Sequence, residues 1–125
     1  MNRRILIVDD ASLVRMYYRD ALERAGYSVD EAMNGLEALE KLLVAPADLL
    51  LVDINMPRMD GTTFLRTLRR QTSPLSAIPA IVTSTEAKPK DMALARAAGA
   101  NYYLVKPVAQ ETVVKYVGLL CGGAV

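Results

Sequence analysis

The chain has 125 residues, of which 52% are hydrophobic and 23% are charged, as expected for a single folded domain. Its 15 basic and 14 acidic residues leave a net charge of +1, so charge does not favour nucleic acid or a membrane surface as a partner. Histidine is absent, which excludes a phosphohistidine carrier, the usual zinc sites and nucleophiles activated by imidazole. The single cysteine, Cys121, cannot form a disulfide within the chain.

No segment of the sequence is marked for export or for crossing a membrane. The first predicted strand already ends at Asp9 and Asp10, which leaves no room for the longer apolar core of a secretory signal. No apolar run approaches the roughly 20 residues of a membrane span. We therefore expect a cytoplasmic protein without membrane contact, folded as one domain over residues 1–125 with no output domain.

Strand-like and helix-like segments alternate along the chain, which predicts five strand–helix units. The predicted strands are residues 4–8, 28–32, 49–52, 80–83 and 103–105. The predicted helices end near Gly26, lie between Asn34-Gly35 and Pro46, span 62–70, lie between Pro89 and Gly99, and span 110–120. Residues 71–79 contain two prolines and two serines and are predicted to form a loop.

The predicted sheet is organised around residues 49–53. Leu49 to Val52 form a short aliphatic run, which is typical of a strand buried on both faces, and the run ends directly in Asp53. Five strand–helix units in a chain of this length predict an α/β fold, a doubly wound five-stranded parallel sheet with helices on both faces. The first and third strands are expected to be neighbours in the middle of that sheet.

The helices are predicted to differ in how firmly they are anchored. Four leucines of the helix between Gly35 and Pro46 are expected to face the core, namely Leu36, Leu39, Leu42 and Leu43. The helix that starts near Pro89 is instead rich in alanine and carries few large apolar side chains. We therefore expect this alanine-rich helix to be the more weakly packed of the two.

Charged side chains gather where the predicted strands end. Asp9, Asp10 and Asp53 are expected at one edge of the sheet, where each pair repels by roughly a few kcal/mol even at an effective dielectric near 20. A hard divalent cation offsets such repulsion, and Mg²⁺ fits best because it takes one or two carboxylates and bridges to phosphate oxygens. Lys106, which ends the fifth strand, adds a cation, and the set suits phosphoryl transfer. The alternative is that the acids cap nearby turns and are screened by solvent.

Several short motifs together resemble the receiver domains of two-component response regulators, and in particular the stand-alone CheY-like chemotaxis type. They are Ile-Val-Asp-Asp at 7–10, Asp-Ile-Asn-Met-Pro-Arg-Met-Asp-Gly at 53–61, Thr-Ser-Thr-Glu-Ala at 83–87, Ala-Gly-Ala at 98–100 and Lys-Pro at 106–107. The match covers essentially the whole chain and is far more specific than any one motif. It implies the flavodoxin-like (βα)5 fold with strand order 2-1-3-4-5.

The resemblance also implies roles for individual residues of the acidic group. Asp53 is the implied phosphoacceptor, which takes a phosphoryl group from the phosphohistidine of a histidine kinase. Mg²⁺ is the implied cofactor, bound by Asp10, Asp53 and the backbone carbonyl of Asn55, with Asp9 acting through water. Asn55 and Glu86 are implied to tune dephosphorylation.

Further residues are implied to bind the phosphoryl group, namely Lys106, Ser84 and Thr85. The peptide bond between Lys106 and Pro107 is implied to be cis, which would aim the lysine at the pocket. Val108 departs from the aromatic residue that often follows this pair, so the next helix starts with a smaller anchor.

A hydroxyl and an aromatic side chain are implied to form a switch. Ser84 is the fifth residue after Pro79 and is the implied switch hydroxyl, at a position where threonine is commoner; Thr83 is its competitor. Tyr103, three residues before the lysine, is the implied switch aromatic, and Tyr102 is the alternative. Serine lacks the methyl group of threonine, so we expect looser coupling to the switch.

Three rival classes can be compared with these residues. Aspartyl phosphatases of the haloacid dehalogenase type need a second acid two residues after the first, where this chain has Asn55. Flavodoxin-type flavin carriers need a phosphate-binding loop after the first strand, where Asp9 and Asp10 would repel phosphate. A degenerate, unphosphorylated receiver is disfavoured because every pocket position is filled.

The expected function is therefore that of a single-domain response regulator that catalyses only its own phosphorylation and dephosphorylation. The resemblance implies a sensor histidine kinase as phosphodonor and a downstream protein bound through the face formed by the helix after Pro89, strand 103–105 and helix 110–120. We expect a monomer that signals in chemotaxis, and that does not bind nucleic acid. A phosphotransfer intermediate of a multi-step phosphorelay and a developmental or polarity regulator stay open as alternatives.

Overall fold

The computed structural model describes residues 2–121 and confirms the predicted sheet. Five parallel strands pair in the order β2-β1-β3-β4-β5. The strands are β1 (Arg4–Val8), β2 (Ser28–Ala32), β3 (Leu49–Asp53), β4 (Ala80–Ser84) and β5 (Tyr102–Val105). Their bounds agree with the predicted ranges to within one residue at each end.

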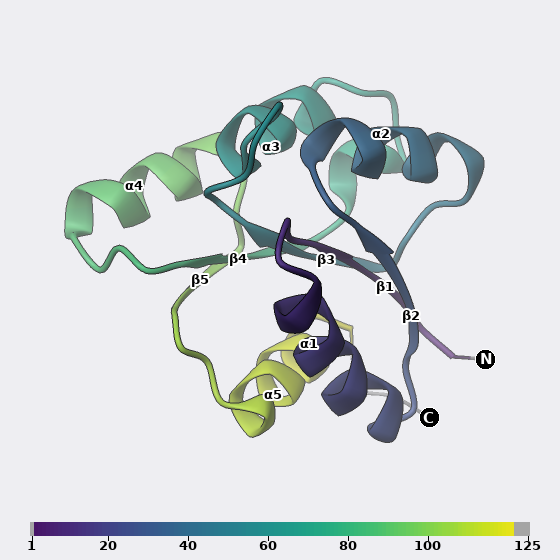
Figure 1. Ribbon diagram of the computed structural model, residues 1–125. Helices are drawn as coiled ribbons and strands as arrows, with labels where there is room; N and C mark the ends of the chain where they lie inside the picture. The colour runs from purple at the N-terminus through teal and green to yellow at the C-terminus, as the bar shows by residue number, and fades with distance from the viewer. Residues whose placement is uncertain (1, 122–125) are drawn as a thin grey trace.

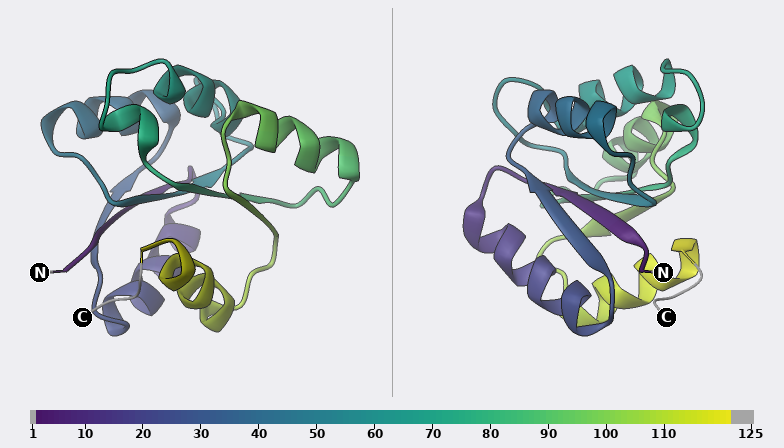
Figure 2. Two further views of the ribbon diagram at one scale, coloured as in Figure 1. Left: turned by 180° about the vertical axis from the view of Figure 1, so that it is seen from behind. Right: turned by 90° about the vertical axis from the view of Figure 1, so that its right-hand side faces the viewer.

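Helices cover both faces of this sheet, as a doubly wound fold requires. They are α1 (Ser12–Arg24), α2 (Gly35–Val44), α3 (Gly61–Arg69), α4 (Pro89–Ala98) and α5 (Gln110–Cys121), with a short 3₁₀ turn, η1 (Leu75–Ala77), before β4. Helices α1 and α5 lie on one face, and α2, α3 and α4 lie on the other (Figures 1 and 2). Among residues 2–121, no helix is both long enough and apolar enough to span a membrane.

Two buried layers fill the space between the sheet and these helices. Because successive side chains of a strand point to opposite faces, Ile5 and Ile7 pack toward α1 and α5, whereas Leu6 and Val8 pack toward α2 and α3. All five residues of β3 are buried. Each fully buried aliphatic side chain contributes about 1.5–3 kcal/mol relative to an exposed one, so the central strands are the most firmly held part of the sheet.

Side-chain caps and close backbone contacts fix the loops at the carboxyl edge of the sheet. The Asn34 side chain accepts a hydrogen bond from the backbone N–H of Glu37 and caps α2, and Asp60 caps α3 by accepting from the N–H of Thr63. A Cβ atom on Gly61 would lie 2.5 Å from the backbone oxygen of Asp53, so only glycine permits α3 to start this close to β3.

The prediction for the α2 leucines is wrong at two positions. Leu36 is 43% exposed and Leu43 is 72% exposed, whereas Ala38 and Leu42 form the buried stripe and Leu39 is half-buried. The small residues of α2 bring its backbone close to its neighbours, because a Cβ atom on Gly35 would lie 2.8 Å from the Cγ atom of Met59. The helix therefore turns its small side chains inward and leaves two leucines at the surface.

Candidate functional site

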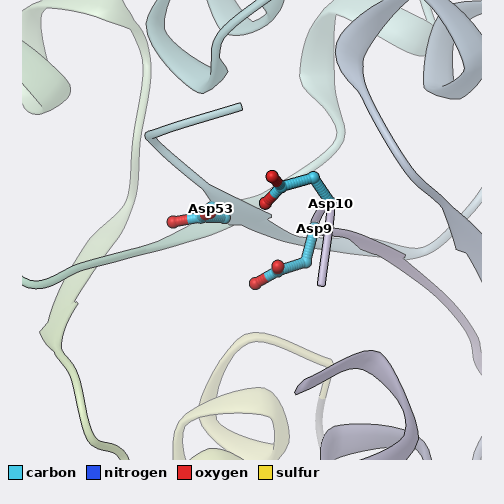
Figure 3. A group of neighbouring side chains, drawn as sticks. All are labelled: Asp9, Asp10 and Asp53. Carbon is cyan, nitrogen blue, oxygen red and sulfur yellow. The ribbon is translucent and has the colours of Figure 1, made fainter. Parts of the chain in front are cut away.

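Three carboxylates meet at the carboxyl ends of β1 and β3. Val8 lies opposite Val52 in the parallel register, so the residues that follow them are neighbours. Carboxylate oxygens of Asp9, Asp10 and Asp53 all lie within 4.8 Å of one another (Figure 3). Asp9 is 1% exposed and Asp53 is 6% exposed, whereas Asp10 faces solvent. Asp9 and Asp53 thus form the buried part of the cluster, and solvent reaches the cluster at Asp10.

Asp9 is fixed in place by contacts from three directions. Its Oδ1 accepts a hydrogen bond of 2.9 Å from the backbone N–H of Ala11, and its Oδ2 accepts one of 3.1 Å from the Nζ of Lys106. The Arg15 guanidinium donates to the Asp9 carbonyl at 2.7 Å. This residue therefore does serve a local turn, as the capping alternative proposed.

Lys106 bridges two of the carboxylates. Its Nζ lies 3.1 Å from Asp9 Oδ2 and 3.3 Å from Asp53 Oδ1, and its peptide bond to Pro107 is cis, as the resemblance implied. Burial alone lowers the pKa of Lys106, but hydrogen bonding to Asp9 and the charges of Asp9 and Asp53 outweigh burial and raise it. The lysine is therefore a fixed cation at the bottom of the site.

The Asp53 carboxylate is poorly neutralised by its surroundings. Burial raises the pKa of Asp53 and the charge of Asp9 raises it further, while Lys106 and the backbone N–H of Asn55 oppose the shift. The cluster offers only carboxylate oxygens and carries surplus negative charge. These are the ligands that a hard divalent cation prefers. The residues present thus fit the implied Mg²⁺, and a cation next to Asp10 would relieve the repulsion.

The switch candidates separate clearly in the structure. Ser84 is buried and its Oγ accepts a hydrogen bond of 3.1 Å from the backbone N–H of Glu86. The Tyr103 hydroxyl donates to the Glu86 carbonyl at 2.7 Å. Tyr102 instead packs edge-to-face on Tyr116 at the exposed side of β5. Ser84 and Tyr103 therefore both bond to the backbone of one residue, Glu86, which their competitors do not.

Three other predicted residues lie on exposed loops around the cluster. Asn55 follows β3, and Thr85 and Glu86 follow β4. Thr85 and Lys106 both line a hollow of about 560 Å³ that opens beside the site. The loops bring these residues to the edge of the carboxylate cluster, and their roles stay predictions.

Two contributions from α1 were missed from the sequence. Arg15 holds the backbone of Asp9, and Tyr18 lines the same hollow as Lys106. Tyr18 had the spacing of an ordinary core residue, so only its phenol, in a layer built mainly from aliphatic side chains, signalled a polar contact. A side chain on one helix cannot be assigned to a lysine 88 positions away from sequence spacing alone.

A comparison with known families decides what kind of domain carries this site. The family model of the response regulator receiver domain matches residues 5–118. The chain belongs to this family. Its receiver fold is also that of the chemotaxis response regulator CheY4 of Vibrio cholerae, with 35% identity and a TM-score of 0.90 over 96% of this chain and 99% of that chain. A response regulator of Chloroflexus aurantiacus is 30% identical with a TM-score of 0.91, over 98% and 99%.

Receiver domains similar to this one also occur within larger proteins. The CAI-1 autoinducer sensor kinase/phosphatase CqsS of Vibrio cholerae is 35% identical over 92% of this chain, and the transcriptional regulatory protein ResD of Bacillus subtilis is 38% identical over 89%. This chain spans 17% and 45% of the lengths of those two proteins. Domains similar to this one thus occur both in a sensor kinase and in a transcriptional regulator.

Proposed function

We propose that this receiver domain accepts a phosphoryl group on Asp53 from the phosphohistidine of a sensor histidine kinase. The observation that carries the proposal is the buried Asp53 carboxylate, held 3.3 Å from Lys106 beside Asp9 and Asp10. A carboxylate oxygen of Asp53 attacks phosphorus, the phosphorus–nitrogen bond of the phosphohistidine breaks, and the imidazole nitrogen takes the electron pair together with a proton from solvent. The product is an acyl phosphate on Asp53 and a neutral histidine on the kinase.

Each residue around Asp53 then has a task in the transfer. Mg²⁺, held by Asp10, Asp53 and the Asn55 carbonyl with Asp9 acting through water, would neutralise charge on the phosphoryl oxygens. Lys106 contacts the Asp53 carboxylate, and it can move from there to an oxygen of the phosphoryl group once that group is attached to Asp53. Catalysis in such a site is mostly positioning and charge neutralisation, which these fixed groups supply.

The hydroxyls after β4 bind the group once it is transferred. Ser84 and Thr85 donate to phosphoryl oxygens, and the Glu86 N–H that now bonds Ser84 has to give way when Ser84 turns. Tyr103 then loses its fixed acceptor on Glu86 and turns inward. The face formed by α4, β5 and α5 changes shape and selects the downstream protein. Asn55 and Glu86, exposed at the site entrance, tune how fast water removes the group.

Chemotaxis is the signalling process that we propose, because nearly the whole of CheY4 matches 96% of this chain. A phosphorelay intermediate and a developmental or polarity regulator are the alternatives, since receiver domains in sensor kinases and in a gliding motility regulatory protein of Myxococcus xanthus are comparably similar. In each case the domain acts in the cytoplasm as a monomer, binds no nucleic acid, and catalyses only its own phosphorylation and dephosphorylation. A pull-down with and without a phosphoryl mimic distinguishes these outputs by the proteins captured.

The acceptor assignment is tested by labelling with a small phosphodonor such as acetyl phosphate. Intact-mass measurement in the presence of Mg²⁺ should find one added phosphoryl group per chain, and Asp53→Asn should reduce labelling to background. Asp48→Asn is the matched control, because Asp48 is an exposed carboxylate one strand-length before the acceptor. Undiminished labelling of Asp53→Asn would sink the assignment, and steady turnover of small phosphomonoesters would favour a phosphatase instead.

A further inference from the structure

A buried threonine hydroxyl next to the acceptor site has no assigned task. Thr83 lies opposite Asp53 in the register of β3 and β4, and it is 1% exposed. Among the described residues, its Oγ1 is buried without a hydrogen-bond partner. Buried polar atoms without partners are rare because their desolvation is not compensated, so this hydroxyl needs an explanation.

The direction of Thr83 differs from that of the switch residue beside it. Successive strand side chains alternate, so Thr83 points to the face opposite Ser84. That face carries Ile81, which packs in the same buried layer as Tyr18 of α1. Asp53 and Lys106 continue the same face on β3 and after β5, since Leu51 and Leu104 belong to this layer. The threonine hydroxyl therefore lies on the side of the sheet from which Lys106 enters the site.

Tyr18 is the other polar group of this layer near the lysine. It is 3% exposed, and it lines the hollow of about 560 Å³ that Lys106 also lines. Burial raises the pKa of the Tyr18 phenol, the charge of Lys106 and the hydroxyl of Thr83 oppose this, and Asp9 adds to it. The phenol and the lysine thus line one space, on the side of the sheet to which Thr83 points.

Lys106 has one N–H without a described partner. An ammonium group has three donors, and Asp9 and Asp53 accept two of them at 3.1 and 3.3 Å. A phenol oxygen can accept one hydrogen bond and donate another, which matches the needs of the lysine on one side and of Thr83 on the other.

We propose that Tyr18 and Thr83 are positioning residues for Lys106. A small turn of the phenol ring lets its oxygen accept the third N–H of the lysine and its O–H donate to Thr83 Oγ1, which has no partner in the geometry described above. These contacts give Lys106, Tyr18 and Thr83 each a partner, which accounts for two hydroxyls beside the lysine in a layer built mainly from aliphatic side chains. The role in phosphoryl transfer rests on the function proposed above for Lys106.

The hollow beside the site explains why such a restraint matters. Lys106 sits on a flexible four-carbon stem, and open space beside it lets the ammonium leave the carboxylates. When a cation or a phosphoryl group engages Asp9 and Asp53, the lysine loses its present anchors, and the phenol still holds it at the site. A preorganised cation needs no rearrangement when charge develops on the phosphoryl oxygens.

The first experiment measures the initial rate of labelling by acetyl phosphate in Mg²⁺. Tyr18→Phe keeps the ring and removes only the hydroxyl, and it should slow labelling by about three- to tenfold, the equivalent of one hydrogen bond. Thr83→Val should also slow the labelling. Tyr27→Phe is the control, because Tyr27 is buried in the same layer but lines no hollow with Lys106, and it should change the rate less than about twofold.

The outcomes separate this inference from the proposed function. A wild-type protein that takes no label overturns the proposed function and the role of Tyr18 with it. A labelled wild type with Tyr18→Phe at the same rate overturns the role of Tyr18 alone. A loss in Tyr27→Phe as large as that in Tyr18→Phe also overturns it, since the effect then comes from the packing of the layer.

A second experiment tests the contact without any phosphoryl transfer. Urea midpoints are compared for Tyr18→Phe in the wild-type background and in a Lys106→Met background. The decrease caused by Tyr18→Phe should shrink by at least about half when the lysine is absent, because one of the two hydrogen bonds of the phenol is then already lost. Equal decreases in the two backgrounds would show that Tyr18 and Lys106 do not interact.

Discussion

The strands that carry the acceptor cluster and the elements at the far edge of the sheet are packed very differently. Every residue of β3 is buried, and in β1 only Arg4 is not. In contrast, α4 buries only Ala95 and Ala98, and β5 buries only Leu104. We call β1 and β3 the firmly packed half and α4 and β5 the weakly packed half. The first is anchored by large aliphatic side chains on both faces, and the second by two methyl groups and one leucine.

This difference suits the two tasks that we propose for this domain. Carboxylates that share a cation and a phosphoryl group must keep fixed separations, and a strand buried on both faces supplies them. An output surface must adopt two arrangements, and weakly anchored elements are the ones that do so at low cost. The two hydrogen bonds on Glu86, from its N–H to Ser84 and from Tyr103 to its carbonyl, lie between the two halves.

The weakly packed half is still held at one end. The Arg69 guanidinium donates to the carbonyl of Gly99 at 2.6 Å, just beyond the last residue of α4, and to the carbonyl of Ile78 at 2.6 Å. Lys88, before the first turn of α4, provides no side-chain cap. Movement of α4 is therefore expected at its N-terminal end, which is the end next to the switch residues.

The largest predicted effect contrasts one leucine from each half. Leu50→Ala in β3 removes a fully buried side chain and should lower the free energy of unfolding by about 3–5 kcal/mol. Leu94→Ala in α4 removes a half-exposed side chain and should cost less than about 1 kcal/mol. Urea denaturation measures both, and equal losses would contradict the contrast between the halves.

The second prediction concerns the metal. Mg²⁺ at about 100 times its dissociation constant should raise the free energy of unfolding by about 2.7 kcal/mol, because it binds the folded state and relieves repulsion among the carboxylates. Asp10→Ala should erase this rise. Asp48→Ala is the control, since Asp48 is exposed and lies at the other end of β3. If the rise persists in Asp10→Ala, the cation binds elsewhere.

A third prediction follows from the charge of Asp53. Burial, and then Asp9, raise the pKa of this carboxyl in the folded state above that in the unfolded chain. Its stabilising contribution is therefore complete below the unfolded pKa of about 3.9 and is lost as the pH rises through the folded pKa. Without metal, Asp53→Asn should unfold at higher urea than wild type at neutral pH, and the gap should close as the solution is acidified. A gap that does not change with pH would contradict this.

The success of the sequence in locating the site has a physical cause. An aliphatic run such as Leu49–Val52 has only one good place in a parallel sheet, so Asp53 had to lie at the carboxyl edge. The same reasoning placed Asp9 and Lys106, because each directly follows a strand. The carboxylate cluster and its lysine were thus determined by local pattern and sheet topology together.

Other features depended on packing between distant segments and were not predictable. Leu36 and Leu43 looked like core residues, but Ala38 and Gly35 let α2 approach so closely that the leucines face solvent. Tyr18 has the spacing of a core residue, and its position beside Lys106 is decided by how α1 docks on the sheet. Hydrophobicity alone does not say which of two apolar stripes a helix buries.

The smallest predicted effect is the response of the weakly packed half to a phosphoryl mimic. Beryllofluoride with Mg²⁺ should change amide exchange from Ser84 through the first turn of α4 and along β5, while Leu49–Val52 and the Arg69-bound end of α4 stay constant. Tyr103→Phe loses the bond to Glu86, worth about 1 kcal/mol, and should raise exchange in this loop before any mimic is added. Tyr102→Phe serves as control, because Tyr102 faces Tyr116 instead. Changes limited to the Asp53 pocket, with residues 84–116 silent, would mean that the acceptor site and the output face are not coupled through Glu86.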